Sequence, residues 1–415
     1  KNMTDPNYKF EYKYPKDLVM RSFPILGKGD DEKIAAAIEL FRAAKKPVIY
    51  SGGGTIQADA SKELTEFSKL IGCPVTNTLM GLGAFPGNDN QFVGMLGMHG
   101  TYEANMVMSE ADLIFNVGAR FDDRITNNPS KFGLAAKKIH IDSDPSSIDK
   151  IIGVDLAIEG DAKLVMQQLI EQVKASGFDQ TIYKDWWSKV EAWRNAHGLN
   201  HDMLNLKNEK DIILPQQVIQ SLYQTTKGDA YVTSDVGQHQ MFAAQYYKFK
   251  DPRKWINSGG LGTMGFGLPS AMGVKFAFPE ADVACVTGEG SIQMCIQELS
   301  TCGQYGLPIK IVNLNNRALG MVKQWQDMQY GGRYSSISYE DSLPDFVKLA
   351  ESFGHVGIKV EKLSELNDAM KESFAMKDKL VFLDVLVDPD EHVYPMLEAG
   401  GSMSEMRLSK DKKTF

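Results

Sequence analysis

The chain has 415 residues, of which 43% are hydrophobic and 24% charged. This length exceeds what one hydrophobic core normally holds, so we expect two or three domains, and the composition excludes a disordered or fibrous chain. Lys and Arg total 45 against 53 Asp and Glu, a net charge of −8, which offers no basic surface to nucleic acid or anionic lipid. No apolar run reaches the ~18 residues of a membrane helix, and we expect a cytoplasmic protein that acts on small molecules.

The chain opens with a polar segment rich in Tyr, Lys and Pro, which predicts an interdomain linker over residues 1–24. From Asp30 onward, helical periodicity alternates with short apolar runs, the pattern of a parallel sheet covered by helices. The expected strands are 48–50, 74–79, 112–119, 138–142 and 154–158. We therefore predict one doubly wound α/β domain over residues 25–180.

Residues 181–211 lose this alternation and carry three tryptophans, which predicts a helical linker whose aromatic side chains cover an interface. A second alternating series follows, with expected strands at 231–233, 283–287, 309–314, 356–360 and 380–387. We predict a second doubly wound α/β domain over residues 212–389. Residues 390–415 have no strong periodicity and are expected to form a flexible terminal arm.

The four cysteines, Cys73, Cys285, Cys295 and Cys302, have neither the spacing of a CxxC pair nor that of a disulfide framework. We expect them to be buried free thiols. The seven histidines include no HExxH motif, so a zinc site is not expected.

Glycine loops follow several of the expected strands, where parallel α/β sheets bind their ligands. The segment 258–265 contains the string GxGxxG, which taken alone is a weak indication of a dinucleotide site. A second turn, Gly288-Glu289-Gly290-Ser291, follows the strand at 283–287, and Asn316 follows the next strand. Glycines let the backbone approach a diphosphate, while a carboxylate and an amide oxygen that meet across adjacent strand ends suit octahedral Mg²⁺. The sequence therefore predicts a combined metal and phosphate site.

The spacing from GEG to NN resembles the diphosphate and metal motif of thiamin diphosphate enzymes, in which the first acidic position is usually Asp. Glu289 departs from that motif by one methylene. Longer strings resemble one family, acetohydroxyacid synthase, over essentially the whole chain; they are GMLGMHGT at 94–101, GARFDDR at 118–124, DVGQHQM at 235–241, SGGLGTMGFGLP at 258–269 and LGMVKQWQ at 319–326.

The resemblance implies a central domain that carries a non-redox FAD and a carboxyl-terminal domain that binds thiamin diphosphate with Mg²⁺. It implies a carboligase that decarboxylates pyruvate and joins the remaining two carbons to a second pyruvate or to 2-ketobutyrate. The products would be 2-acetolactate or 2-aceto-2-hydroxybutyrate, in the first common step of branched-chain amino acid biosynthesis. A homodimer or tetramer is implied, and whether a small regulatory subunit binds as a further partner is left open. The family's activating Glu lies in an amino-terminal domain without a match here, so we expect full activity to need that domain.

In the second domain, the resemblance implies two groups of site residues. The metal ligands would be Glu289, Asn316 and the carbonyl oxygen of Ala318. Met264 would support the bent cofactor, and Trp325 would favour 2-ketobutyrate by packing against its extra methyl group, a contact worth only about 1 to 3 kcal/mol. The implied cofactor contacts are Val236, Gly237, Gln238, His239, Gly262, Met264, Gly288, Glu289, Gly290, Ser291, Asn316, Leu319, Gly320 and Met321.

In the first domain, the resemblance implies a set of FAD contacts. Arg124 would also face the substrate channel, and it is implied as a catalytic residue in addition to Trp325 and Met264. Asp142 and Asp161 would lie near the adenosine, where a carboxylate can accept hydrogen bonds from ribose hydroxyls. The implied FAD contacts are Gly52, Gly53, Gly54, Thr78, Leu79, Leu96, Gly97, Met98, His99, Gly118, Ala119, Arg120, Asp122, Arg124, Asp142 and Asp161.

Three alternatives remain open at this point. A pyruvate oxidase or another thiamin diphosphate decarboxylase would share the fold and the metal. A flavin or nicotinamide oxidoreductase would use the GxGxxG string at 260–265, and a noncatalytic flavin-binding protein would need no thiamin. The products and the cofactor requirement separate these possibilities.

Overall fold

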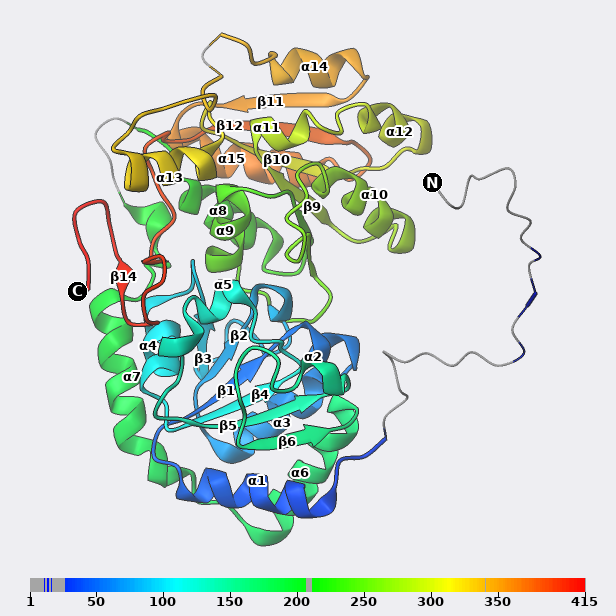
Figure 1. The fold of residues 1–415 in the computed structure, drawn as a ribbon. Coiled ribbons are helices and arrows are strands. Elements are labelled where there is room, and N and C mark those ends of the chain that lie inside the picture. Colours follow the sequence, from blue (N-terminus) through cyan, green and yellow to red (C-terminus); the bar gives the residue numbers. More distant parts are fainter. Residues whose placement is uncertain are drawn as a thin grey trace.

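The computed structural model of the chain describes residues 11, 13, 14, 16, 27–206, 211–339 and 341–414. These residues form two α/β units, each built on a six-stranded parallel sheet, and a small two-stranded antiparallel sheet near the carboxyl end (Figure 1). The predicted fold class, two doubly wound parallel-sheet domains, is confirmed. Most of the predicted linker over residues 1–24 lies outside the described residues. Within them, no helix has the length and apolar character needed to cross a bilayer.

The first sheet has the strand order β3, β2, β1, β4, β5, β6, which is the order of dinucleotide-binding folds, with the topological switch point between β1 and β4. Its strands are β1 (Pro47–Ser51), β2 (Val75–Asn77), β3 (Phe92–Met95), β4 (Leu113–Val117), β5 (Lys137–Asp142) and β6 (Leu156–Glu159). Its main helices are α1 (Asp31–Ala43), α2 (Gly53–Gln57), α3 (Ser61–Ile71), α4 (Tyr102–Glu110), α5 (Asp123–Thr126) and α6 (Ala162–Ser176).

Helix α1 illustrates how the sequence determines the local structure and packing of the first unit. The Asp30 carboxylate accepts hydrogen bonds from two backbone N–H groups of the first turn and so caps α1. The apolar residues Ile34, Ile38 and Phe41 recur at helical spacing and are buried. The Phe41 ring lies 5.2 Å from the Phe115 ring on β4, so this stripe packs directly on the sheet.

The second sheet has the order β11, β12, β10, β9, β7, β8, with its switch point between β7 and β9. Its strands are β7 (Tyr231–Ser234), β8 (Trp255–Asn257), β9 (Val283–Thr287), β10 (Lys310–Asn315), β11 (Val356–Val360) and β12 (Val381–Leu386). Its helices are α8 (Pro215–Thr226), α9 (Gln238–Tyr246), α10 (Gly267–Ala277), α11 (Glu289–Ile292), α12 (Glu298–Tyr305), α13 (Gly320–Tyr330), α14 (Phe346–Ser352) and α15 (Leu363–Ala375). All four cysteines are buried and free, as predicted.

The segment between the two sheets contains the helix α7 (Lys184–His197), which packs on the first unit. The Trp186 indole N–H donates to the Pro47 carbonyl at 3.0 Å, and the Trp187 indole N–H donates to the Gly72 carbonyl at 2.7 Å. These two tryptophans therefore anchor the connecting helix to the body that precedes it.

The segment over residues 393–408 is largely packed, so the prediction of a flexible terminal arm over residues 390–415 is wrong there. Strands β13 (Met396–Leu397) and β14 (Met406–Arg407) pair in antiparallel fashion. Met403 and Met406 are buried in the core of the first unit, and the Asn127 amide donates to the Glu398 carbonyl at 2.7 Å. The sequence conceals this packing because the buried side chains are irregularly spaced and follow neither the helical nor the strand period.

Replacing Met406 with alanine is expected to lower the free energy of unfolding by about 2 to 5 kcal/mol, because a fully buried side chain is truncated. Urea unfolding measures the change. Lys410 lies in the same arm but is exposed, and Lys410→Ala should change the stability by no more than about 0.5 kcal/mol. Equal, small effects of the two substitutions would show that the arm is not packed in solution.

Candidate functional site

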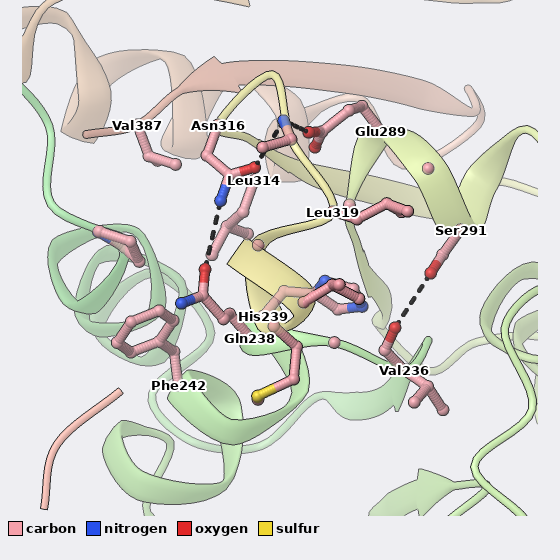
Figure 2. A pocket seen from close by; sticks show the side chains of 18 of the residues that line it. Val236, Gln238, His239, Phe242, Glu289, Ser291, Leu314, Asn316, Leu319 and Val387 are labelled. Atoms are coloured by element: carbon pink, nitrogen blue, oxygen red, sulfur yellow. Dashed lines mark hydrogen bonds between the residues drawn. The ribbon is translucent and has the colours of Figure 1, made fainter. Parts of the chain in front are cut away.

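A pocket lies at the carboxyl edge of the second sheet, where the loops after β7, β9 and β10 meet (Figure 2). This edge, beside the switch point, is the usual ligand position in an open parallel sheet. The pocket is lined by Pro215, Val236, Gly237, Gln238, His239, Phe242, Met264, Gly288, Glu289, Gly290, Ser291, Leu314, Asn316, Ala318, Leu319, Gly320, Met321, Val322 and Val387.

The structure brings Glu289 and Asn316 together, as the sequence predicts. They follow β9 and β10, which are parallel neighbours in the sheet. The Ala318 N–H donates to Glu289 Oε1 at 2.6 Å and to Asn316 Oδ1 at 3.1 Å, so the two side-chain oxygens converge on one backbone group.

Glu289 is only 2% exposed, and burial raises the pKa of its carboxyl to about 8. Backbone N–H groups, including that of Ala318, partly offset this effect, while the nearby Asp384 adds to it. A buried carboxylate without a cationic neighbour is costly, and a divalent cation would relieve that cost. The donor set fits Mg²⁺, which prefers oxygen ligands and commonly shares them with substrate phosphates.

Within the described ranges, no group of three or more His, Cys, Asp or Glu side chains is arranged to hold a metal ion. The predicted set would not register as such a group, because it combines one carboxylate with an amide oxygen and a backbone carbonyl. Glu289, Asn316 and Ala318 therefore remain our proposed ligands.

His239 supplies the second polar feature of the pocket. Its ring is buried, and its Nε2 atom has no hydrogen-bond partner in the described part of the chain. Burial lowers the pKa of the imidazole to about 4, so the ring is neutral near pH 7. Because an unpaired buried polar atom is unfavourable, the free nitrogen indicates a place for a ligand oxygen.

The loops around His239 are glycine-rich because they approach it closely. A Cβ atom on Gly288 would lie 2.8 Å from His239 Nδ1, and one on Gly320 would overlap the side-chain amides of Gln238 and Asn316. The Ser291 hydroxyl donates to the Val236 carbonyl at 3.1 Å and thereby ties the loop after β9 to the loop after β7.

Most of the cofactor contacts implied for the second domain line this pocket, including Met264, but Gly262 does not. The implied catalytic residues Trp325 and Arg124 also lie outside the lining. Arg124 belongs to α5 of the first unit, where its exposed guanidinium pairs with Asp123 at 3.3 Å. The roles implied for these three residues stay predictions.

The pocket also has an apolar wall that the sequence did not predict. Leu314 lies within β10, and Val387 directly follows β12, the strand beside β10. The sequence does not place Val387 here, because β12 neighbours β10 only through a reversal of the chain order of β11 and β12 in the sheet. The missed lining residues are Pro215, Phe242, Leu314, Val322 and Val387.

The FAD contacts implied for the first domain all lie at the carboxyl edge of the first sheet or in the loops that follow its strands. At the switch point, the Gly54 N–H donates to the Gly118 carbonyl at 3.0 Å, so the loops after β1 and β4 touch. The His99 ring is buried, its Nδ1 has no partner among the described residues, and burial lowers its pKa to about 4. The chain therefore offers close backbone and a free polar atom to a ligand at this edge.

Two of the implied acidic contacts already have structural roles. Asp161 accepts a hydrogen bond from the Leu164 N–H at 3.1 Å and caps α6. Asp122 caps α5 and pairs with Arg120 at 3.2 Å. Their expected contacts with FAD therefore stay predictions.

Comparison with known protein families shows which class of protein this chain belongs to. Residues 34–169 match the family described as "Thiamine pyrophosphate enzyme, central domain", and residues 235–385 match "Thiamine pyrophosphate enzyme, C-terminal TPP binding domain". The chain thus carries the central and the C-terminal TPP-binding domains of a thiamin diphosphate enzyme.

Individual relatives of the chain show which family of thiamin diphosphate enzymes it resembles. The chain is 54% identical over 418 residues to "Acetolactate synthase isozyme 3 large subunit" of Escherichia coli, covering 100% of this chain and 72% of that protein. It is 52% identical over 414 residues to "Acetolactate synthase large subunit" of Haemophilus influenzae, covering 100% and 71%. A relative from Mycobacterium tuberculosis, "Acetolactate synthase large subunit IlvB1", is 39% identical over 403 residues, covering 96% and 65%.

The chain belongs to the acetolactate synthase large-subunit family. This membership confirms the resemblance inferred from the motif strings, since acetohydroxyacid synthase is the same family. It also confirms the predictions of an enzyme and of thiamin diphosphate as a cofactor.

Proposed function

We propose that the protein condenses two 2-ketoacids. Pyruvate loses carbon dioxide, and the remaining two carbons join a second pyruvate or 2-ketobutyrate to give 2-acetolactate or 2-aceto-2-hydroxybutyrate. Identity above one half with acetolactate synthase large subunits over the whole chain supports this reaction. The structural observation that carries it is the convergence of Glu289 and Asn316 on one backbone N–H at the carboxyl edge of the second sheet.

Bound thiamin diphosphate supplies the electron sink that makes decarboxylation and carboligation feasible. The residues of the chain bind and orient it. Glu289, Asn316 and the Ala318 carbonyl would hold Mg²⁺. A neutral His239 with its proton on Nε2 would donate to a phosphate oxygen. Met264 and Leu319 line the same pocket with apolar side chains and would exclude water from the reacting atoms.

The first unit is proposed to hold FAD in a role without redox chemistry. The dinucleotide-type strand order, the contact between the glycine loops at the switch point and the free Nδ1 of His99 support this assignment. The alternative of a flavin oxidoreductase predicts that substrate turnover reduces the flavin.

The partners are proposed from the relatives, which are named as large subunits. We propose a homodimer or tetramer that binds a small regulatory subunit, with pyruvate and 2-ketobutyrate as substrates. A contribution of the activating Glu from a domain outside residues 1–415 stays a prediction, as does the cytoplasmic location.

The test uses full-length protein stripped of its cofactors. We expect thiamin diphosphate, Mg²⁺ and FAD together to restore the formation of acetolactate from pyruvate, with no oxygen uptake and no bleaching of the flavin. Omission of Mg²⁺ with excess chelator should abolish the activity. Production of peroxide or acetyl phosphate would identify a pyruvate oxidase, and flavin reduction by substrate would identify an oxidoreductase; either result would contradict the proposal.

A further inference from the structure

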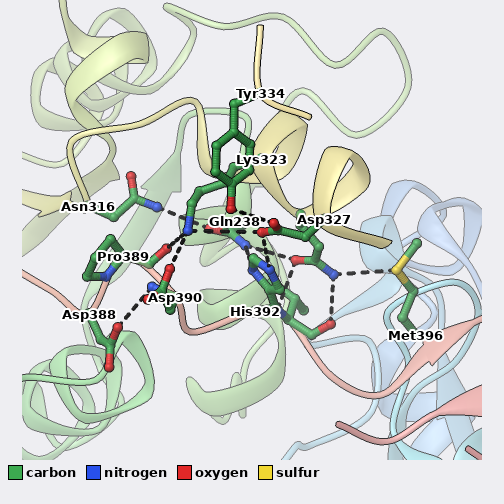
Figure 3. Close-up of polar contacts among 12 residues, drawn as sticks. Gln238, Asn316, Lys323, Asp327, Tyr334, Asp388, Pro389, Asp390, His392 and Met396 are labelled. Carbon is green, nitrogen blue, oxygen red and sulfur yellow. Dashed lines mark hydrogen bonds and ion pairs between the residues drawn. The ribbon is translucent and has the colours of Figure 1, made fainter. Parts of the chain in front are cut away.

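Behind the pocket, a buried polar network joins Asn316 to α13 and to the segment that follows β12 (Figure 3). It begins at the backbone of Val393. The Val393 N–H donates to Gln324 Oε1 at 3.0 Å, and Gln324 Nε2 donates to the Val393 carbonyl at 3.1 Å. Because a backbone N–H only donates and a carbonyl only accepts, these two contacts fix the orientation of the fully buried Gln324 amide.

The fixed Gln324 amide then orients Gln238. Gln238 Nε2 donates to Gln324 Oε1 at 2.8 Å, so Gln238 Oε1 faces the opposite way and accepts from Asn316 Nδ2 at 3.2 Å. With its amide nitrogen committed to Gln238, Asn316 turns Oδ1 toward the Ala318 N–H, on which Glu289 also converges. The direction of every hydrogen bond in this series follows from the Val393 backbone.

His392 supports the same orientation from the other side. Gln238 Nε2 lies 3.4 Å from His392 Nδ1, and His392 Nε2 lies 2.8 Å from Asp327 Oδ2. Because the Gln238 nitrogen only donates, His392 Nδ1 accepts, and the ring carries its proton on Nε2 and donates it to Asp327. The Tyr334 hydroxyl donates to the same carboxylate at 2.5 Å and helps to hold it in place.

The segment that carries His392 and Val393 is anchored to α13. Lys323 Nζ donates to the Pro389 carbonyl at 2.8 Å and pairs with Asp390 at 2.5 Å. The lysine is itself buried, with 8% of its surface exposed. The residues after β12 are therefore held at a fixed distance from the helix that begins beside the proposed metal ligands.

We propose that Gln324 and His392 are positioning residues that hold the Gln238 amide in one of its two orientations and thereby turn the Asn316 carbonyl toward the metal position. This inference rests on the proposed function. A flipped Gln238 would set its Nε2 against Asn316 Nδ2, two donors that repel each other, and Asn316 would turn its NH₂ group toward the cation. An NH₂ group has no lone pair to offer a metal, and partners that orient a metal ligand typically change metal affinity about 10- to 100-fold.

The experiment measures binding of Mn²⁺, as a paramagnetic substitute for Mg²⁺, to full-length protein in the presence of thiamin diphosphate by electron paramagnetic resonance. Gln324→Met keeps the side-chain length but removes the amide, and we expect it to weaken Mn²⁺ binding about tenfold. The melting temperature of each apoprotein shows whether the variant is folded.

A pair of His392 substitutions separates orientation from general packing. His392→Asn places an oxygen near the position of Nδ1, and we expect the affinity for Mn²⁺ to stay close to that of the wild type. His392→Gln places its amide near Nε2 but offers no acceptor to Gln238, and we expect a several-fold weaker affinity, at the lower end of the range for such partners. A purely structural role would not distinguish the two amides in this direction.

His355 is the matched control, because it lies in the same unit, is partly buried and hydrogen-bonds through Nε2 to the Leu299 carbonyl at 2.8 Å, away from the Gln238 amide. His355→Asn should bind Mn²⁺ like the wild type. The proposal is overturned if folded Gln324→Met and His392→Gln both bind Mn²⁺ as tightly as the wild type. If Gln324→Met does not fold, the His392 pair alone decides.

The same measurement separates failure of this inference from failure of the proposed function. If Glu289→Gln loses Mn²⁺ binding while the Gln324 and His392 variants keep it, the metal site stands and the positioning role is wrong. If the wild type does not bind Mn²⁺, or if Glu289→Gln binds it equally well, the proposed metal site is wrong and this inference falls with it.

Discussion

Glu289→Gln is expected to weaken the binding of Mg²⁺ with thiamin diphosphate by more than about 100-fold, a larger loss than that of a partner that only orients a ligand. The substitution removes the single carboxylate of the proposed ligand set and leaves an amide of the same size. The Ala318 N–H keeps an acceptor, so the loop should retain its shape. Isothermal titration of the apoprotein with Mg²⁺ and thiamin diphosphate measures the affinity, and acetolactate formation should fall in parallel.

The same substitution should stabilise the apoprotein, because the wild type holds a buried carboxyl whose pKa is raised to about 8 from the ordinary glutamate value of 4.5. Between these two values, the folded state keeps a proton that the unfolded state releases, so the stability of the wild type falls as the pH rises through this window. Glutamine has no such dependence. We expect urea unfolding in a chelator to show Glu289→Gln more stable than the wild type at pH 8, and the difference to disappear near pH 4.

Adding the metal and the cofactor should reverse this order, because ligands that bind only the folded state stabilise it. The wild type should gain stability and Glu289→Gln should not. Glu372 on α15 is exposed, and Glu372→Gln is the matched control, with the wild-type response expected in both conditions. Glu289→Asp shortens the side chain by one methylene and should retain most of the affinity. A Glu289→Gln protein that binds the cofactor normally would exclude this residue as a metal ligand.

The meeting of Glu289 and Asn316 in this pocket could be predicted from the sequence, because it depends only on which strands are neighbours in the sheet. Glu289 and Asn316 follow consecutive strands, and consecutive strands of a parallel sheet usually lie side by side, as β9 and β10 do here. Val387 could not be placed in the same way, because its position requires that β12 lie between β10 and β11, which reverses the order of the last two strands.

Most strands of the two parallel sheets were predicted, but two strands at the sheet edges were missed. Strands β9 and β11 were predicted with the observed bounds, whereas β3 and β8 were missed. β3 contains Gly94, and β8 has three residues directly after a charged stretch. Neither has the length or the alternation that identifies a strand from its own residues, and both sit at or near a sheet edge, where neighbouring strands determine their conformation.

The orientation of Gln324 marks a different limit of sequence reasoning. Within LGMVKQWQ this glutamine has no feature that separates it from Gln326, which instead bonds to the backbone of Ser335 near the surface. Only the approach of Val393, 69 residues further along the chain, gives the Gln324 amide its defined direction. A polar network whose residues come from distant segments can therefore be recognised only once the fold is known.

Gly52→Val is expected to remove FAD from the purified protein, because Gly52 lies where the loops after β1 and β4 touch. A Cβ atom at this position would overlap the carbonyl oxygen of Gly118 and lie 2.6 Å from Ala119 Cβ. The Gly52 N–H also donates to the Val117 carbonyl at 2.9 Å, which prevents the loop from withdrawing. The larger side chain must therefore push apart the two loops that we propose to face the flavin.

Overpacking of this kind usually costs about 1 to 3 kcal/mol, which leaves a domain of this size folded while its ligand site is deformed. Flavin absorbance of the purified protein, together with its thermal unfolding, separates the two effects. Gly153→Val is the control, because a Cβ atom on Gly153 meets nothing within 4 Å, and its flavin content should equal that of the wild type. A folded Gly52→Val protein with full flavin content would place FAD elsewhere, since no ligand could lie against these loops and be indifferent to their separation.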